Sequence, residues 1–252
     1  MQSLDQQEKL QAFIFDLDGV LTETQKQHIK AWRHMFNAFL KDRAKKNGTE
    51  YKPFTVSDYR KYVDGKPRYD GAKDFLESRK LTLPQGRKED PPDSETVDGL
   101  GNRKDKYFEQ ILDKEGATVY QSSIDFVRYL RRIGIKTAVV SSSKNCGHIL
   151  RVAHIDNLFE VKVDGNDLDA LKIPGKPDPA MFLEAARRLG AEPRESAIVE
   201  DALAGVEAGR RGGFGLVVGM AHAGDEEELK EHGADIAVSD LRKLETKPRI
   251  FG

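Results

Sequence analysis

The sequence predicts an α/β protein with a parallel sheet covered by helices on both faces and a small all-helical domain inserted after the first strand. Two observations carry this prediction. Short apolar runs alternate with amphipathic helical patterns over the second half of the chain, which is typical of a parallel sheet. A long stretch after the first run has no strong strand pattern. Among the 252 residues, we expect 1–23 and 117–252 to form the core and 24–116 the inserted domain.

The first strand is expected at Ala12–Phe15, a short apolar run that is closed by the turn residues Asp16–Gly19. Five more strands are expected after the insert, at Lys136–Val140, Val161–Val163, Ala197–Val199, Gly215–Val218 and Ile236–Val238. Helical patterns accompany these strands, at Ile124–Arg132, Gly147–Ala153, Pro179–Leu189, Ala202–Arg211 and Glu226–Glu231.

The inserted domain has its own pattern. Amphipathic stretches at His28–Lys46 and Tyr69–Ser78 predict helices. The polar segment Gln85–Gly99, rich in proline and acidic residues, predicts a loop. An insert after the first strand begins where strand carboxyl ends meet, so it could roof a site there.

Charge and composition limit the partners. Lys and Arg total 41 against 42 Asp and Glu, so no global field draws the chain to nucleic acid or to an anionic membrane. The single Cys146 excludes an internal disulfide and a multi-cysteine zinc site. The N-terminus lacks the apolar stretch of a signal peptide, and no run approaches about 18 apolar residues. We expect a cytoplasmic monomer with neither nucleic acid nor membrane as a partner.

Asp16 and Asp18 form an acidic pair at the end of the first strand. Positions i and i+2 of an extended chain point the same way, so both carboxylates face one spot. A divalent cation such as Mg²⁺ would relieve their repulsion, and Gly19 would let the backbone turn around it. The alternative is an exposed turn without a ligand. A calcium loop does not fit, because Val20 stands where a third oxygen ligand belongs.

A second acidic pair, Glu200 and Asp201, follows another apolar strand and starts a helix. Acids are common at helix N-termini, which is the alternative explanation. Two acidic strand ends in one sheet nevertheless favour a metal site. In the following helix, Gly205 and Gly209 are four residues apart and predict close packing of that helix on the sheet.

Two further segments could bind phosphate. Ser141–Asn145 follows a strand and offers hydroxyls, a cation and the amides of a helix start. Serine is also a common helix cap, which is the alternative. The stiff segment Pro174–Pro179 displays Lys176, although a surface turn with a solvated lysine would look the same.

In chain order, Asp16–Thr22, Ser141, Lys176 and the pair Glu200-Asp201 resemble the four motifs of the haloacid-dehalogenase-like superfamily of phosphatases and phosphomutases. Each motif is modest, but the ordered set on strand ends is very specific. The resemblance runs from about Phe13 to Leu241 and implies a Rossmann-like core.

Within that superfamily the chain is similar to the beta-phosphoglucomutase group, which carries a small helical cap after the first strand. The likeness rests on His28–Trp32, Gly65–Arg68, Arg103-Lys104 and Ser143–Asn145. The chain departs from the group in three places: Glu23 replaces the usual Asp, Ala202 replaces a frequent Ser, and the cap has a longer polar segment. These departures concern the substrate and leave the core chemistry intact.

The resemblance implies a role for each matching residue. Asp16 would be the nucleophile and Asp18 the general acid and base. The Asp16 carboxylate, the Asp18 carbonyl and the pair Glu200-Asp201 would hold Mg²⁺. Ser141 and Lys176 would contact the transferring phosphoryl group. The substrate would be bound by His28, Trp32, Gly65, Arg68, Lys104, Ser142, Ser143, Lys144 and Asn145.

Alternatives remain open for the cap residues: His28 and Trp32 could be core side chains, and Arg68 could be an exposed charge. The expected function is Mg²⁺-dependent phosphoryl transfer on a sugar phosphate, in the manner of a beta-phosphoglucomutase. A phosphatase of a small phosphorylated metabolite is the alternative, because the same side chains could hold one phosphate instead of a second one. A dehalogenase would not need Asp18 or the metal acids, and a non-catalytic binding protein would normally have lost a motif residue.

Overall fold

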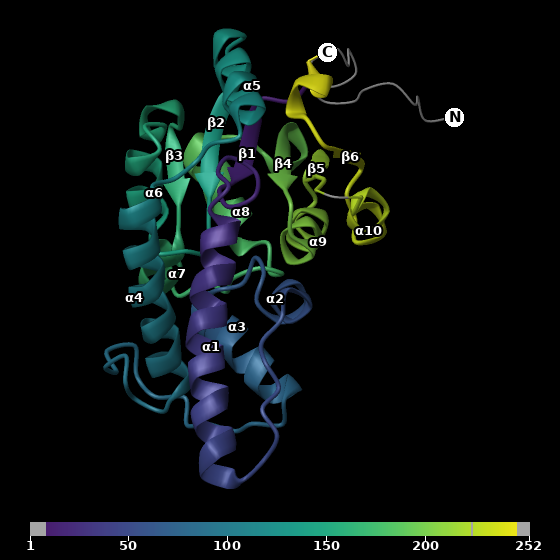
Figure 1. Cartoon of the computed structure of the whole chain (residues 1–252). Helices are drawn as coiled ribbons and strands as arrows, with labels where there is room; N and C mark the ends of the chain where they lie inside the picture. Colours follow the sequence, from purple (N-terminus) through teal and green to yellow (C-terminus); the bar gives the residue numbers. More distant parts are fainter. Residues whose placement is uncertain (1–8, 223, 246–252) are drawn as a thin grey trace. The chain divides into compact units, whose positions relative to one another are not determined.

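In the computed structural model, which describes residues 9–222 and 224–245, six strands form one parallel sheet in the order β3-β2-β1-β4-β5-β6 (Figure 1). Every expected strand is present within one or two residues of its predicted limits: β1 Ala12–Asp16, β2 Lys136–Val140, β3 Val161–Val163, β4 Ser196–Glu200, β5 Leu216–Met220 and β6 Ile236–Val238. The α/β fold class is thereby confirmed. The strand order reverses at β1, and ligands of open parallel sheets bind beside such a switch point.

The strand register brings two acidic residues to one edge of the sheet. Strand β1 lies between β2 and β4, with Asp16 opposite Val140 and Phe15 opposite Val199. All residues of β1 and β4 are buried, as expected for central strands covered on both faces. Asp16 and Glu200 therefore end neighbouring strands at the same level.

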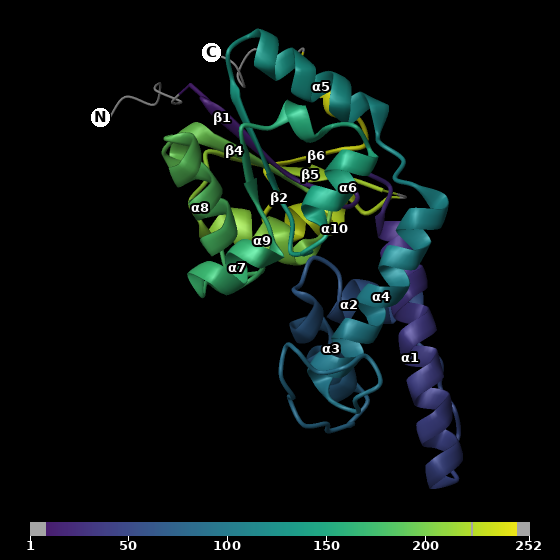
Figure 2. The same cartoon turned by 90° about the vertical axis from the view of Figure 1, so that its left-hand side faces the viewer.

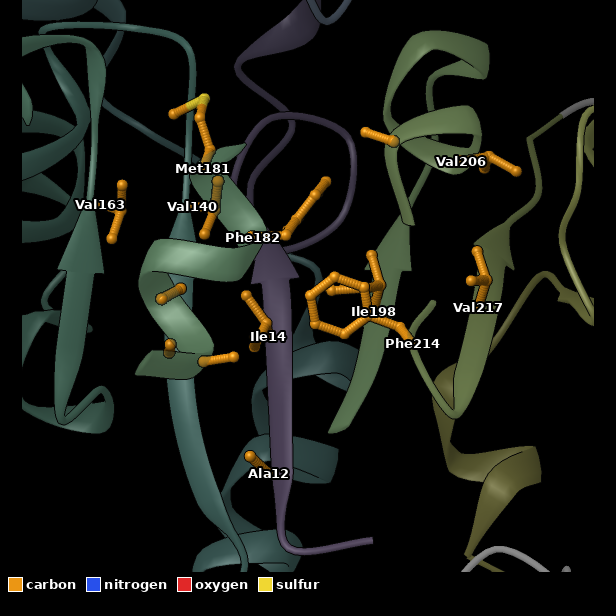
Figure 3. Close-up of a cluster of buried hydrophobic side chains, with 14 of the residues drawn as sticks. Ala12, Ile14, Val140, Val163, Met181, Phe182, Ile198, Val206, Phe214 and Val217 are labelled. Atoms are coloured by element: carbon orange, nitrogen blue, oxygen red, sulfur yellow. The ribbon is translucent and has the colours of Figure 1, made fainter. Parts of the chain in front are cut away.

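One face of the sheet is covered by the helices α7 Gly165–Leu171, α8 Ala180–Leu189, α9 Leu203–Arg211 and α10 Glu226–Glu231. Alternate residues of β1, Ala12 and Ile14, join Met181 and Phe182 of α8 and Val206 of α9 in the buried cluster of this face (Figure 3). The helices pack on the sheet through this cluster.

The other face is covered by helix α5, Gln121–Arg132. Phe13 and Phe15 point away from Ala12 and Ile14, and the ring of Phe126 meets that of Phe13 edge-on at 5.6 Å between centres. Figure 2 shows α5 and α8 on opposite sides of the sheet. Helix α6, Cys146–Val152, follows β2, and single 3₁₀ turns occur at Asp156–Leu158, Pro193–Glu195 and Leu241–Leu244.

The chain divides into two compact units, the first reaching to Glu23 and resuming at Thr118, the second spanning Thr24–Ala117. The second unit holds the helices α1 Gln25–Asn47, α2 Val56–Tyr62, α3 Arg68–Ser78 and α4 Val97–Glu115. Its own core is built from aromatic and aliphatic side chains that include Trp32, Phe36, Phe54, Phe75 and Leu100.

The structure corrects the sequence prediction at α2, α4 and α7, which were not expected as helices. Each begins with a side-chain cap: Thr55 accepts from Asp58 N, Thr96 from Gly99 N, and Asp164 from Asn166 N. The predicted loop Gln85–Gly99 is therefore wrong at its end, because the Thr96 cap starts α4 at Val97. Among the described residues, no helix has both the length and the apolar composition needed to cross a bilayer.

Candidate active site

Three carboxylates meet at the switch point of the sheet. Asp16 ends β1, Glu200 ends β4 and Asp201 follows it, and one oxygen of each lies within 4.8 Å of the others. Asp16 and Glu200 are buried, so their charges are poorly solvated. Closely spaced carboxylate oxygens are the hard donors that Mg²⁺ prefers, and this set therefore fits such an ion.

Lys176 is the counter-charge of two of these acids. Its buried Nζ donates to Asp16 Oδ1 and to Glu200 Oε1. Burial alone would lower the pKa of Lys176, but the two ion pairs outweigh burial and raise it above its ordinary value. The lysine predicted from the proline-rich turn is therefore an internal, charged residue of the site and not a solvated surface group.

Burial raises the pKa of Asp16 well above its ordinary value. Lys176 acts against this rise, whereas the neighbouring charges of Glu200 and Asp18 add to it. The Asp16 carboxylate thus lies among negative charges that Lys176 offsets only in part. A divalent ion would offset more of this negative charge.

Glu200 is held at both oxygens, because Lys176 binds Oε1 and the backbone N–H of Ala202 donates to Oε2 at 2.9 Å. Helix α9 passes directly over this carboxylate, and a Cβ on Gly205 would lie 1.9 Å from Glu200 Oε1. A Cβ on Gly209 would lie 3.1 Å from Val217 Cγ2, which is a tight contact. The two glycines thus allow the close packing that their spacing predicts.

Asp18 lies outside the three-carboxylate cluster, although it is two residues from Asp16. Ser141 Oγ, at the end of β2, lies 3.5 Å from Asp18 Oδ2, the outer limit of a hydrogen bond. The turn between the two acids and Thr22 is closed by Gly19, whose N–H donates to Thr22 O at 2.7 Å.

Gly19 is required here for two reasons. Its φ of +90° is unfavourable for other residues, and a Cβ would lie 1.8 Å from Asp201 Oδ2. Asp201 therefore packs directly against the backbone of the turn that follows Asp16.

The segment Ser141–Asn145 shows the hydroxyl-to-amide contacts of a helix cap, and its binding of phosphate stays a prediction. Hydroxyls of Ser141 and Ser143 accept from the N–H groups of Ser143 and Asn145, each at 3.1 Å, as capping residues do. Lys144 Nζ pairs with Asp169 at 2.6 Å, and Ser142 Oγ lies 4.0 Å from Met181 Sδ. Asn145 precedes helix α6.

In the second unit, the structure brings together three of the predicted substrate residues. His28 and Trp32 of α1 and Lys104 of α4 are all buried. Lys104 Nζ donates to His28 Nδ1 at 2.7 Å and lies 5.4 Å from the centre of the Trp32 ring. The His28 ring stacks on Phe108, with 3.9 Å between centres. Lys104 thus belongs to the same cluster as His28 and Trp32.

Arg68 begins helix α3, just after Gly65, whose φ is +71°. Its Nη1 pairs with Asp105 Oδ2 of α4 at 2.5 Å, and its side chain is only 12% exposed. The alternative of an exposed charge is therefore wrong for Arg68.

Sequence reasoning did not single out His222, which follows β5 at the same edge of the sheet. Its Nε2 lies 2.7 Å from Gly19 O and 3.9 Å from Asp201 Oδ2, and its ring stacks on Tyr120. Burial, with the charges of Glu23 and Asp201, raises the pKa of Tyr120 to about 12. A polar residue two positions after a third parallel strand was the available signal.

Comparison with known proteins identifies the family to which the chain belongs. A family model described as haloacid dehalogenase-like hydrolase matches residues 10–213. The chain belongs to the haloacid dehalogenase-like hydrolase family. The resemblance of the four motifs to that family is thereby confirmed.

This haloacid dehalogenase-like chain is 45% identical over 241 residues to a beta-phosphoglucomutase of Mycobacterium tuberculosis, covering 94% of this chain and 92% of that one. It is 27% identical over 228 residues to a phosphorylated carbohydrates phosphatase of Thermotoga maritima, covering 89% and 92%. The crystal structure of a beta-phosphoglucomutase from Clostridium difficile shares the fold, with a TM-score of 0.73, 24% identity and 94% of each chain covered. The chain is an enzyme, either a phosphomutase or a phosphatase.

Proposed function

We propose that the chain is a Mg²⁺-dependent phosphoryl-transfer enzyme that acts on a sugar phosphate through an aspartyl-phosphate on Asp16, as a mutase of the beta-phosphoglucomutase kind. The observation that carries this proposal is the buried cluster of Asp16, Glu200 and Asp201 with Lys176 at the switch point of the sheet. The sugar substrate is supported by the names of the relatives from M. tuberculosis and T. maritima.

Each residue of the cluster has a role in the proposed reaction. A carboxylate oxygen of Asp16 attacks phosphorus, and the bond from phosphorus to the leaving sugar oxygen breaks. Asp18 gives its proton to that leaving oxygen and afterwards takes a proton from the incoming hydroxyl, whose oxygen bonds to phosphorus as the bond from phosphorus to Asp16 breaks. Lys176 orients the Asp16 carboxylate, and together with Ser141 it stabilises the charge on the phosphoryl oxygens.

The Asp16, Glu200 and Asp201 carboxylates and the Asp18 carbonyl are the groups that would hold Mg²⁺. When bound, the ion offsets the negative charge of the acids and of the phosphoryl group. The two contacts that fix Glu200 leave lone pairs on its oxygens, since each carboxylate oxygen can accept more than one interaction.

A phosphatase is the second candidate, and a specific observation favours it. A mutase must hold a second phosphate, and the cations proposed for that task, Arg68 and Lys144, are paired with Asp105 and Asp169. A hydrolase needs to bind only the phosphate that it removes, so these pairs do not obstruct it.

Phosphorus NMR of the purified protein with Mg²⁺ tests the proposal. With β-glucose 1-phosphate and a bisphosphate primer, a mutase converts the substrate to an isomeric sugar phosphate with little inorganic phosphate, whereas a phosphatase releases phosphate. Asp16→Asn should abolish either activity by several orders of magnitude while the far-UV circular dichroism stays native, because an amide cannot attack phosphorus. Wild-type rates in Asp16→Asn, or no turnover of any sugar phosphate, would contradict the proposal.

A further inference from the structure

His222 makes two contacts at the site through the same nitrogen. Its Nε2 lies 2.7 Å from Gly19 O and 3.9 Å from Asp201 Oδ2. A carbonyl oxygen can only accept a hydrogen bond, so Nε2 carries the proton and donates to Gly19. Asp201 is a member of the three-carboxylate cluster and Gly19 lies in the turn beside it, whereas His222 lies outside the cluster.

The imidazole ring of His222 is held in place from several sides. Its backbone N–H donates to Asp225 Oδ1 at 2.7 Å, and the preceding Ala221 N–H donates to Val238 O at 2.8 Å. Its ring stacks on Tyr120, with 5.5 Å between centres, and Tyr120 N donates to Leu21 O at 3.0 Å. The ring thus has a fixed position relative to the turn that follows Asp16.

The hydrogen bond from His222 restrains the one residue of that turn with the greatest conformational freedom. Gly19, at φ +90°, joins two peptide planes. The plane that contains the Asp18 carbonyl is fixed by the bond from Gly19 N to Thr22 O, and the plane that contains the Gly19 carbonyl is fixed by His222. The two bonds together set both planes.

Asp201 depends on the same turn. A Cβ on Gly19 would overlap its carboxylate, so the carboxylate rests directly on the Gly19 backbone, and the side chain is only 3% exposed. A rotation of the peptide that carries the Gly19 carbonyl would therefore displace Asp201 Oδ2.

We propose that His222 is a positioning residue for the metal site: its Nε2–H fixes the Gly19 carbonyl and thereby sets the Asp201 carboxylate, which rests on the Gly19 backbone, for a divalent cation. This inference rests on the proposed function, because it assumes that the Asp201 carboxylate binds Mg²⁺. Groups that orient metal ligands from outside the ligand set commonly change metal affinity by about 10- to 100-fold when removed.

The test compares Mg²⁺ binding to the full-length variants by isothermal titration calorimetry, without substrate. His222→Phe keeps a ring against Tyr120 but cannot donate, and we expect its dissociation constant for Mg²⁺ to rise about tenfold. His222→Gln places an amide N–H near the position of Nε2, and we expect it to recover most of the affinity. The matched control is His232→Phe, since His232 Nδ1 bonds the carbonyl of Glu228 at 2.8 Å within the α10 region.

Thermal unfolding without Mg²⁺ separates positioning from general support of the fold. Positioning predicts weaker Mg²⁺ binding in His222→Phe at a nearly unchanged midpoint, and wild-type binding in His232→Phe. The inference is overturned if His222→Phe binds Mg²⁺ like the wild type, or if His222→Gln binds as weakly as His222→Phe. If the wild type itself binds no Mg²⁺, the proposed function fails together with this inference, whereas normal wild-type binding with unchanged variants refutes only the role of His222.

Discussion

Glu200 can lie beneath helix α9 only because residue 205 has no side chain. Its carboxylate is buried and fixed by Lys176 and by the Ala202 N–H, and the place of a Cβ on Gly205 is already filled by the glutamate. Glycine is less favourable than alanine inside a helix, but at this position only glycine leaves room for an acidic group at the end of β4. Packing and chemistry are linked through this single glycine.

Gly205→Ala tests that link. The added methyl group must displace Glu200 or lift α9, so we expect the free energy of unfolding to fall by about 1–3 kcal/mol, with a severe loss of phosphoryl transfer. Urea unfolding and an activity assay measure the two effects. Gly147→Ala in helix α6 is the matched control, because the nearest atom to its Cβ would be 3.5 Å away. Similar behaviour of the two variants would show that Glu200 adapts at little cost.

Helices α3 and α4 are joined by an ion pair between Arg68 and Asp105. Because the Arg68 side chain is mostly buried, its guanidinium is held in a defined orientation by a carboxylate. Such a group can exchange its carboxylate partner for a phosphate, since both accept two parallel hydrogen bonds from the arginine fork. This exchange is the behaviour that the proposed mutase would need.

Arg68→Ala should therefore have an effect that depends on the substrate. The loss of a charge-assisted contact is worth about 1.5–3 kcal/mol, so kcat/KM for a sugar phosphate with a second phosphate should fall about 10- to 100-fold. Hydrolysis of para-nitrophenyl phosphate should change little, since the residues of the sheet edge are untouched. Arg79→Ala, which removes the pair with Asp58 in the same unit, is the control. Equal losses for both substrates would assign Arg68 a structural role.

Helix α8 carries a charged network on its outer face. Glu184 accepts hydrogen bonds from Arg187 and Arg188, and Arg188 also pairs with Asp167 of α7 at 2.7 Å. The bond from Arg187, followed by the bond from Arg188, outweighs partial burial and lowers the pKa of Glu184 from 4.5 to about 2. The network thus favours the ionised glutamate.

The lowered pKa predicts a pH-dependent stability. The folded state prefers the charged Glu184. The contribution of this residue to the free energy of unfolding is therefore fully present above pH 4.5 and is lost as the pH falls toward 2. Glu184→Gln should lower the free energy of unfolding by about 0.5–1 kcal/mol at pH 7 and by less at pH 3.5, as measured in urea. Glu77→Gln, from an exposed pair 3.9 Å long, should have little effect. A difference that stays constant between the two pH values would exclude the linkage.

The enzyme as a whole should be stabilised by the cation that its acids are proposed to bind. A ligand that binds only the folded state at 100 times its dissociation constant adds about 2.7 kcal/mol to the free energy of unfolding. We expect Mg²⁺ to raise the thermal midpoint and a chelator to abolish activity. Asp201→Ala should remove most of the rise in the midpoint that Mg²⁺ causes, and most of the activity. Calcium should bind but inhibit, because its longer bonds would misplace the reacting groups. Full activity in chelator would contradict the metal assignment.

The strands and the acids at their ends could be predicted from the order of residues alone. Apolar runs such as Phe13–Phe15 and Ile198-Val199 are local signals, and the carboxyl ends of parallel strands must share one edge of a sheet. That rule was enough to place Asp16 and Glu200 at one edge of the sheet, whereas the pairing of β1 with β4, which makes them neighbours, was decided by the tertiary structure.

The remaining contacts were decided by the tertiary structure. Lys104 meets His28 from 76 residues away, and His222 meets Gly19 from 203 residues away. Helices α2, α4 and α7 were missed, since short or mixed helices are stabilised by caps and by packing more than by their own periodicity. A hydrogen bond or ion pair loses its strength within a few ångströms. The pairing of cations with acids therefore depends on distances that are set only when the elements pack.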